Sequence, residues 1–192
     1  MVAAAKLVFD FALPTEEVGT NELLLPDREI KWVRRLFEKA IGGFYEVMLK
    51  PKGWQVQRGR RLNWQFEQKT PDIEKILPTM QTDVILDHPR SGQRIVIDTK
   101  FTAIVTPGWF RAETLRSGYL YQIYAYLRSQ TGCGDVLADS ASGLLLHPAI
   151  GQMFDETVMI QGHHIRFATV DLSATTATIR AQLLKMCESK FK

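Results

Sequence analysis

Residues 80–101, MQTDVILDHPRSGQRIVIDTKF, contain two short aliphatic runs joined by the turn-forming residues HPRSGQ. These runs predict two strands of a β-hairpin, and both look internal to a sheet because they are apolar on both faces. If the hairpin turns at Arg90-Ser91, the numbers of paired residues add up to 181, which places Asp83 opposite Asp98. Side chains alternate along a strand, so Lys100 shares a face with Asp98. The sequence therefore predicts two acids and a lysine within a hydrophobic sheet.

The two opposed acids need a positive charge between them. Directly opposed side chains in a hairpin have Cβ atoms about 4.5–5.5 Å apart, and an internal carboxylate without a partner is costly. Lys100 can neutralise one acid, and a divalent metal bound by Asp83, Asp98 and a nearby backbone carbonyl would offset the other, as Mg²⁺ prefers oxygen ligands. The alternative is an ion pair between Asp98 and Lys100 near a sheet edge, with Asp83 and Asp87 flanking a solvated turn.

Composition limits the class of protein. The 192 residues include 24 Lys and Arg against 21 Asp and Glu, a net charge of +3, which permits binding to nucleic acid without demanding it. Cys133 and Cys187 lie far apart and outside any Cys/His spacing, so we expect no disulfide framework, zinc site or iron–sulfur cluster. Because Lys6 and Asp10 interrupt the apolar N-terminal stretch, and no segment has the length of a membrane span, a cytoplasmic location is expected.

The hydrophobic pattern predicts further helices and strands around this hairpin. One helix is expected from Asp27, as its N-cap, to residue 50, and another over residues 116–132, with Ser117 as a cap and Gly132 as a stop. The other expected elements are a hairpin over 53–68, strands over 82–87, 94–101, 143–148, 157–161 and 164–172, and a helix over 176–190. This order predicts an α/β or α+β sheet with helices on its faces. Residues 1–26 are expected to form an extended lead-in.

Several segments resemble a known nuclease superfamily. TDVIL and IVIDTK resemble the metal-binding strands of PD-(D/E)XK nucleases, and YLYQIYAYL resembles the Gln-x-x-x-Tyr helix of their RecB-like branch. More narrowly, RRLFEKAIGGFY, LPTMQTDVIL, VIDTKF and YLYQIYAYL are in this order similar to the nuclease part of the McrC family, over roughly residues 28–187. The resemblance implies an α/β restriction-endonuclease-like fold, with a central mixed β-sheet flanked by helices and one nuclease domain over residues 27–192.

The resemblance also implies roles for the acids and the lysine. Asp83 and Asp98 would be the metal-binding acids, and the Thr99 carbonyl would be a further ligand of Mg²⁺. Lys100 would position or activate the attacking water and stabilise charge on the scissile phosphate. The proline that precedes the first acid in the superfamily's name is Thr82 here. A literal Pro-Asp pair occurs at residues 71–72, where we expect Asp72 to have a turn or cap role.

Three helical residues complete the implied site. Glu38 corresponds to an acid that such nucleases often place beside the metal, although a helical Glu is usually solvated. Gln122 and Tyr126 are four residues apart and share one helix face. In the RecB-like pattern this face meets the active site and helps to hold the lysine or the DNA. The alternative is a tyrosine-rich helix that only packs on the sheet.

A basic stretch is the candidate DNA-binding element. Residues 50–69 contain six basic residues, among them Arg58, Arg60 and Arg61, and one acid, and Trp54 and Trp64 are interleaved with the basic residues. A basic hairpin of this kind could follow a phosphate backbone. The alternative is an ordinary exposed hairpin whose tryptophans pack inward.

The remaining sequence features argue against nucleotide binding and against a histidine metal site. The chain has no Gly-x-x-x-x-Gly-Lys-Ser/Thr loop, so we expect it to bind no nucleotide itself. His88 and His147 lie beside prolines, and the pair His163-His164 lies at an expected turn. No two of these positions have the spacing of metal ligands, so we expect surface or loop positions for the histidines.

Taken with the resemblance, these residues lead us to expect a Mg²⁺-dependent DNA endonuclease. The resemblance implies an McrC-like cleavage subunit of a GTP-dependent, 5-methylcytosine-specific restriction system, which defends against foreign DNA, with an McrB-like AAA+ GTPase as its partner. The alternatives are a stand-alone RecB-like repair or phage nuclease, and a catalytically inactive DNA-binding or assembly module of the same fold.

Overall fold

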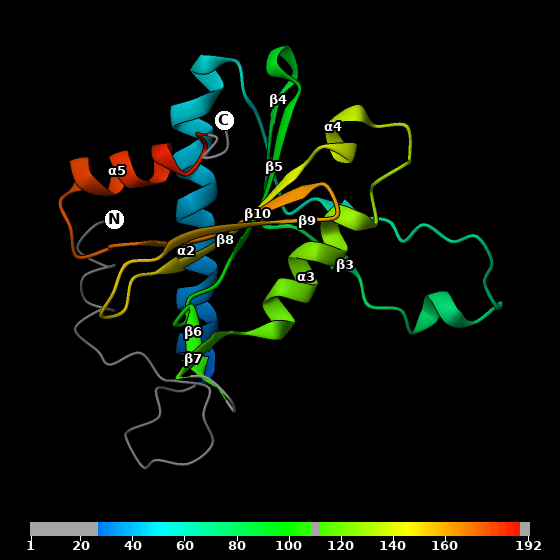
Figure 1. The fold of residues 1–192 in the computed structure, drawn as a ribbon, viewed down its shortest axis with the longest axis horizontal. Helices are drawn as coiled ribbons and strands as arrows, with labels where there is room; N and C mark the ends of the chain where they lie inside the picture. Colours follow the sequence, from blue (N-terminus) through cyan, green and yellow to red (C-terminus); the bar gives the residue numbers. More distant parts are fainter. Residues whose placement is uncertain (1–26, 109–111, 189–192) are drawn as a thin grey trace.

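A mixed six-stranded sheet lies at the centre of the fold (Figure 1). The computed structural model describes residues 27–108 and 112–188, so the predicted lead-in over residues 1–26 lies outside the described residues. The strand order is β1-β4-β5-β8-β10-β9, in which β5 and β10 run parallel to β8 and the other neighbours are antiparallel. The strands are β1 (Gln55–Arg58), β4 (Val84–His88), β5 (Gln93–Thr99), β8 (Ser142–Pro148), β9 (Asp155–Ile160) and β10 (His163–Val170). The fold is therefore α/β, with the predicted mixed central sheet.

Helices cover both faces of the sheet, and each face has its own hydrophobic core. On one face lie α2 (Asp27–Leu49) and α5 (Thr176–Lys185), and on the other lie α3 (Ser117–Arg128) and the short α4 (Val136–Asp139) (Figure 1). The first core joins the α2 side chains to those of Val84, Leu86, Ile95, Ile97, Leu144 and Leu146. The second joins the α3 side chains to those of Ile85, Val96, Leu145, Ile165 and Phe167. This alternation shows that both hairpin strands are buried on both faces, as the sequence predicts.

Gly143 of β8 leaves room for two side chains of helix α3. A Cβ atom on Gly143 would lie 2.8 Å from Cγ1 of Ile123 and 3.1 Å from Cδ1 of Leu127. Such distances are shorter than carbon atoms in contact normally reach, so only glycine fits at this position. The close approach brings the polar face of α3 over the end of the neighbouring strand, β5.

The register of the β4–β5 hairpin is the predicted one. Val84 pairs with Ile97 and Ile85 with Val96, so the numbers of the partners add up to 181. The predicted long helices, the strands β8, β9 and β10 and the C-terminal helix are also present, with ends shifted by a few residues. Ser117 is the first residue of α3 rather than its cap, and no side chain caps this helix end.

The predicted hairpin over residues 53–68 is wrong. β1 pairs with β4, and β2 (Arg61–Leu62) pairs with β3 (Met80–Gln81), so the two strands of the predicted hairpin do not pair with each other. Residues 55–62 instead run antiparallel to residues 80–87 in one register, with a bend at Gly59, whose N–H donates to the Asp83 carbonyl at 2.9 Å. Alternating polarity predicts a strand but does not identify its partner, which explains the error.

Shorter elements fill the connections. They are η1 (Lys50–Lys52), η2 (Ile73–Lys75), η3 (Pro89–Ser91) and the paired strands β6 (Val105–Pro107) and β7 (Glu113–Leu115). The connection between β2 and β3 extends away from the sheet (Figure 1). Asp72 lies on this connection, exposed and paired with Lys75, in agreement with the expected turn role. None of the described helices is long and apolar enough to cross a membrane.

Candidate active site

The strand end that carries Asp98 and Lys100 combines burial with charge. Asp98 lies on β5 between β4 and β8, and its side chain is only 2% exposed. Its Oδ2 lies 2.8 Å from the Lys100 ammonium, which makes an ion pair. Apart from this ion pair, no described residue donates a hydrogen bond to this buried oxygen. The ion pair of the alternative interpretation is therefore present, but on an internal strand instead of a sheet edge.

Asp83 lies beside this pair, one residue before β4. Its Oδ2 accepts hydrogen bonds from the Thr99 backbone N–H and hydroxyl, both at 2.6 Å. The bend at Gly59 fixes the backbone here, since the Asp83 carbonyl accepts from the Gly59 N–H. Continuing the hairpin register by one step from Val84 and Ile97 brings Asp83 opposite Asp98. The Asp83 side chain is held by Thr99, however, and not by Lys100.

The pKa of Asp98 reflects this environment. The pKa is raised from 3.8 to about 6, mainly by burial; Lys100 lowers it and the negative charge of Asp83 raises it. A carboxylate that keeps a raised pKa despite an ion pair lacks full compensation for its burial. Strongly perturbed acids of this kind are typical of functional sites.

The polar face of α3 meets the lysine, as the RecB-like pattern implies. Lys100 Nζ donates to Gln122 Oε1 at 2.9 Å, and Gln122 Nε2 donates to the Tyr126 hydroxyl at 2.6 Å. The same ammonium lies 5.0 Å from the centre of the Tyr119 ring. Burial raises the pKa of Tyr126 above its ordinary value. The ammonium is thus held by a carboxylate, an amide oxygen and an aromatic face.

Glu38 also belongs to this cluster. It lies on α2, half-buried, and its pKa is raised first by burial and then by the negative charge of Asp83. The positive charges of Lys39, Arg35 and Lys100 act in the opposite direction. Helix α2 therefore brings a third acid within electrostatic reach of the hairpin acids.

The donor set suits a Mg²⁺ ion completed by substrate and water. Among the described residues, no three His, Cys, Asp or Glu side chains form a ready-made metal cage. Mg²⁺ is commonly bound through only one or two carboxylates, with water and phosphate oxygens in the remaining positions. Asp83 and Asp98 provide two carboxylates, and the Oδ2 of Asp98 is a buried oxygen without a hydrogen bond. The Thr99 carbonyl remains a predicted ligand; the structure shows only the contacts of its N–H and hydroxyl with Asp83.

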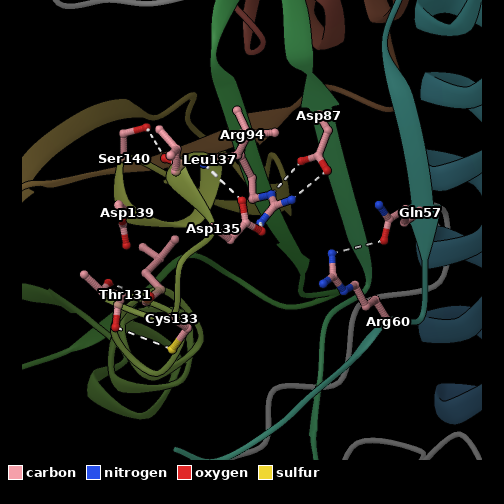
Figure 2. Close-up of polar contacts among 12 residues, drawn as sticks. Gln57, Arg60, Asp87, Arg94, Thr131, Cys133, Asp135, Leu137, Asp139 and Ser140 are labelled. Carbon is pink, nitrogen blue, oxygen red and sulfur yellow. Dashed lines mark hydrogen bonds and ion pairs between the residues drawn. The ribbon is translucent and has the colours of Figure 1, made fainter.

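The three predicted DNA-binding arginines lie in residues 55–62, which run antiparallel to residues 80–87 beside Asp83. They do not form a separate hairpin. Arg58 lies 3.4 Å from Glu46, Arg60 donates to Gln57 at 3.3 Å (Figure 2), and Arg61 is exposed. The tryptophans of this region, Trp54 and Trp64, pack against the two cores, as the alternative interpretation expected. The arginines therefore lie near the acids, and their role in DNA binding stays a prediction.

A second charged cluster was missed by the sequence interpretation. Asp87 is buried, not solvated, and accepts from Arg94 Nε and Nη2 at 2.6 and 2.8 Å, while Arg94 Nη1 donates to Asp135 at 2.6 Å (Figure 2). The signal was available, because 87 and 94 also add up to 181 in the predicted register. These charges satisfy one another, and the cluster therefore has a structural role at the opposite end of the hairpin.

The comparisons with known proteins identify no relative. Neither the family models nor the curated proteins match this chain. A proposal for its function therefore depends on the site geometry.

Proposed function

We propose that this chain is a Mg²⁺-dependent DNA endonuclease with a PD-(D/E)XK restriction-endonuclease-like fold. The observation that carries the proposal is the pair Asp98–Lys100, in which a buried, incompletely satisfied carboxylate lies 2.8 Å from an ammonium that Gln122 orients. Asp83 adds a second acid beside it. Two acids and a lysine at one strand end provide what phosphodiester hydrolysis needs, namely ligands for a cation and a positive charge for the phosphate.

Each side chain has a distinct part in the proposed reaction. Hydrolysis forms a bond from a water oxygen to phosphorus and breaks one ester bond, whose leaving oxygen takes up a proton. A bound Mg²⁺ supplies a water of lowered pKa and positive charge beside the phosphate. Asp83 and Asp98 would hold the ion, and Lys100 would orient the water and offset charge on the phosphate. Gln122, Tyr126 and Tyr119 fix the direction of the ammonium, and Glu38 adds negative charge beside the ion.

The biological context that we propose is a GTP-dependent, 5-methylcytosine-specific restriction system. The chain would be its McrC-like cleavage subunit and would act with an McrB-like AAA+ GTPase. A stand-alone RecB-like repair or phage nuclease is the alternative, and co-purification with a GTPase separates the two. An inactive module of the same fold is disfavoured, since a site without catalytic use has no need for a buried carboxylate with a raised pKa.

The test compares DNA cleavage by the wild type, Asp98→Asn and Lys100→Ala. Asp72→Asn is the matched control, because it removes the same charge from the literal Pro-Asp pair on the exposed connection. Each protein is incubated with methylated and unmethylated plasmid, in Mg²⁺ or in chelator, with and without a GTPase encoded beside it. We expect Mg²⁺-dependent cleavage that falls roughly 100-fold or more in both site variants and is unchanged in the control. Cleavage that persists in both site variants would show that the assignment is wrong.

A further inference from the structure

His147 is buried next to the proposed active site, contrary to the expected loop position. It lies on β8, is 1% exposed, and its Nδ1 lies 2.9 Å from the Thr102 carbonyl, to which the neutral ring donates. Its ring centre lies 5.9 Å from that of Tyr119, the residue that contacts the Lys100 ammonium. The backbone N–H of Lys100 donates to the carbonyl of Leu146, the residue before His147. His147 therefore borders the lysine on the neighbouring strand.

Two cations act on this imidazole. The pKa of His147 is lowered to about 4, first by burial and then by the positive charges of Lys100 and Arg116, while the bond to Thr102 opposes the change. Arg116 directly precedes α3, and its carbonyl accepts from the N–H of Tyr119. Lys100 and Arg116 thus both lie near the aromatic pair Tyr119 and His147.

Arg116 differs from the two buried arginines, Arg94 and Arg166. Arg94 is paired with Asp87 and Asp135, and Arg166 is paired with Asp155 and with three backbone carbonyls. Arg116 is only partly buried, but its Nε atom is buried and has no hydrogen-bond partner within residues 27–108 and 112–188. The residue as a whole is partly exposed, so its positive charge, which has no ion pair with a described residue, can be stabilised by an anion from solution.

We propose that Arg116 binds a phosphate of the DNA strand next to the phosphate held at Lys100. This inference rests on the proposed nuclease function and names the residue that positions the strand there. An arginine fork suits two oxygens of a phosphate, and DNA offers phosphates in a regular row on either side of the scissile bond. Thr102 belongs to the same cluster, because its carbonyl contacts His147. Thr102 is 8% exposed, and its buried hydroxyl also has no hydrogen-bond partner among the described residues. Arg116 is a positioning residue, which does not touch the reacting atoms.

The test measures DNA binding and its dependence on salt. Arg116→Gln removes the charge and keeps a hydrogen-bond donor, and Arg128→Gln is the matched control, because Arg128 is exposed in the last turn of the same helix. Both changes are made in the Asp98→Asn background, which prevents the proposed cleavage during the measurement. Fluorescence anisotropy with a short labelled duplex gives affinity against salt concentration. Circular dichroism and thermal unfolding confirm that each variant folds.

We expect Arg116→Gln to lower affinity about tenfold at low salt and to reduce the slope of log affinity against log salt by about 0.9. Arg128→Gln should leave the slope unchanged. Duplexes that carry one neutral methylphosphonate, placed at successive positions, locate the contact. At one position the methylphosphonate should lower the affinity of the Asp98→Asn protein but not that of the Asp98→Asn protein that also carries Arg116→Gln.

Two results would overturn the inference while the nuclease function stands. One is an unchanged salt slope in Arg116→Gln, and the other is an equal reduction in both arginine variants. If the background protein binds no duplex at low salt, or if cleavage survives the Asp98 and Lys100 substitutions, the proposed function itself fails. The cleavage and binding measurements therefore separate the two failures.

Discussion

Asp98→Asn should stabilise the metal-free protein even though it abolishes the proposed activity. Burial and the charge of Asp83 raise the pKa of Asp98 from 3.8 to about 6. Because one pH unit corresponds to about 1.4 kcal/mol, the ionised carboxylate costs about 3 kcal/mol of folding free energy at pH 8. Asparagine has nearly the same shape and no charge, and Lys100 keeps its hydrogen bond to Gln122. We therefore expect a gain of up to about 3 kcal/mol in the free energy of unfolding.

The gain should depend on pH in a defined direction. The folded state binds a proton at Asp98 more tightly than the unfolded chain does, since its pKa in the folded state is about 6 instead of 3.8. The stability contributed by this proton is fully present below about pH 3.8 and is lost as the pH rises through about 6. Wild type and Asp98→Asn should therefore converge in stability at low pH and differ most above pH 7.

Chemical denaturation in chelator, followed by tryptophan fluorescence at several pH values, measures this difference. Asp87→Asn is the control, because Asp87 is a buried acid of the same hairpin whose two oxygens accept from Arg94. Its substitution leaves a buried guanidinium without its main partner and should destabilise by about 3–5 kcal/mol. If Asp98→Asn destabilises the protein at pH 8 as Asp87→Asn does, Asp98 is a structural acid and the reasoning fails.

The other predictions concern the surroundings of this acid. Mg²⁺ should raise the thermal unfolding midpoint of the wild type but not of Asp98→Asn, as differential scanning fluorimetry can show. The wild type should lose about 1.4 kcal/mol of unfolding free energy per pH unit as the pH falls from 6.5 to 4, because the buried His147 ring has a pKa of about 4. His147→Asn should not show this loss, and denaturation of both proteins in this pH range tests it. Gly143→Ala should destabilise by about 1–3 kcal/mol in the same denaturation assay, since the new methyl group pushes against α3. Gln122→Ala should slow single-turnover cleavage by roughly tenfold to 100-fold without unfolding the protein, because Lys100 loses its hydrogen-bond acceptor.

The sequence predicts the hairpin of the central sheet because two local signals agree there. Apolar runs on both faces require internal strands, and the short turn leaves few registers in which those runs pair. The observed pairing of Val84 with Ile97 follows from these constraints. The same signals are absent over residues 53–68, where the true partner lies beyond a connection of 17 residues, 63–79. Alternating polarity carries no information on such distant pairing.

The site is predictable only as far as strand and helix periodicity extend. Alternation along β5 places Asp98 and Lys100 on one face, and the four-residue spacing of Gln122 and Tyr126 places them on one face of α3. The contact between these two faces depends on how closely the helix packs, which Gly143 permits. His147 and Arg116 could not be assigned to the cluster, because their positions depend on the parallel pairing of β5 with β8 and on the start of α3.

The buried acids at the two ends of the hairpin differ in their hydrogen-bond partners. At one end the register pairs an acid with a base, Asp87 with Arg94, and every oxygen of Asp87 accepts a hydrogen bond. At the other end the same register leads to two acids, and Asp98 keeps an oxygen without a hydrogen bond. One hairpin therefore contains a buried acid whose two oxygens are hydrogen-bonded, Asp87, and another that has only its ion pair with Lys100, Asp98. A sequence under selection for stability alone could place an apolar residue at position 98, as it does at Val96. The proposed Mg²⁺ would account for the difference, because Asp83 and Asp98 are two acids beside one lysine, and the ion would supply the further positive charge.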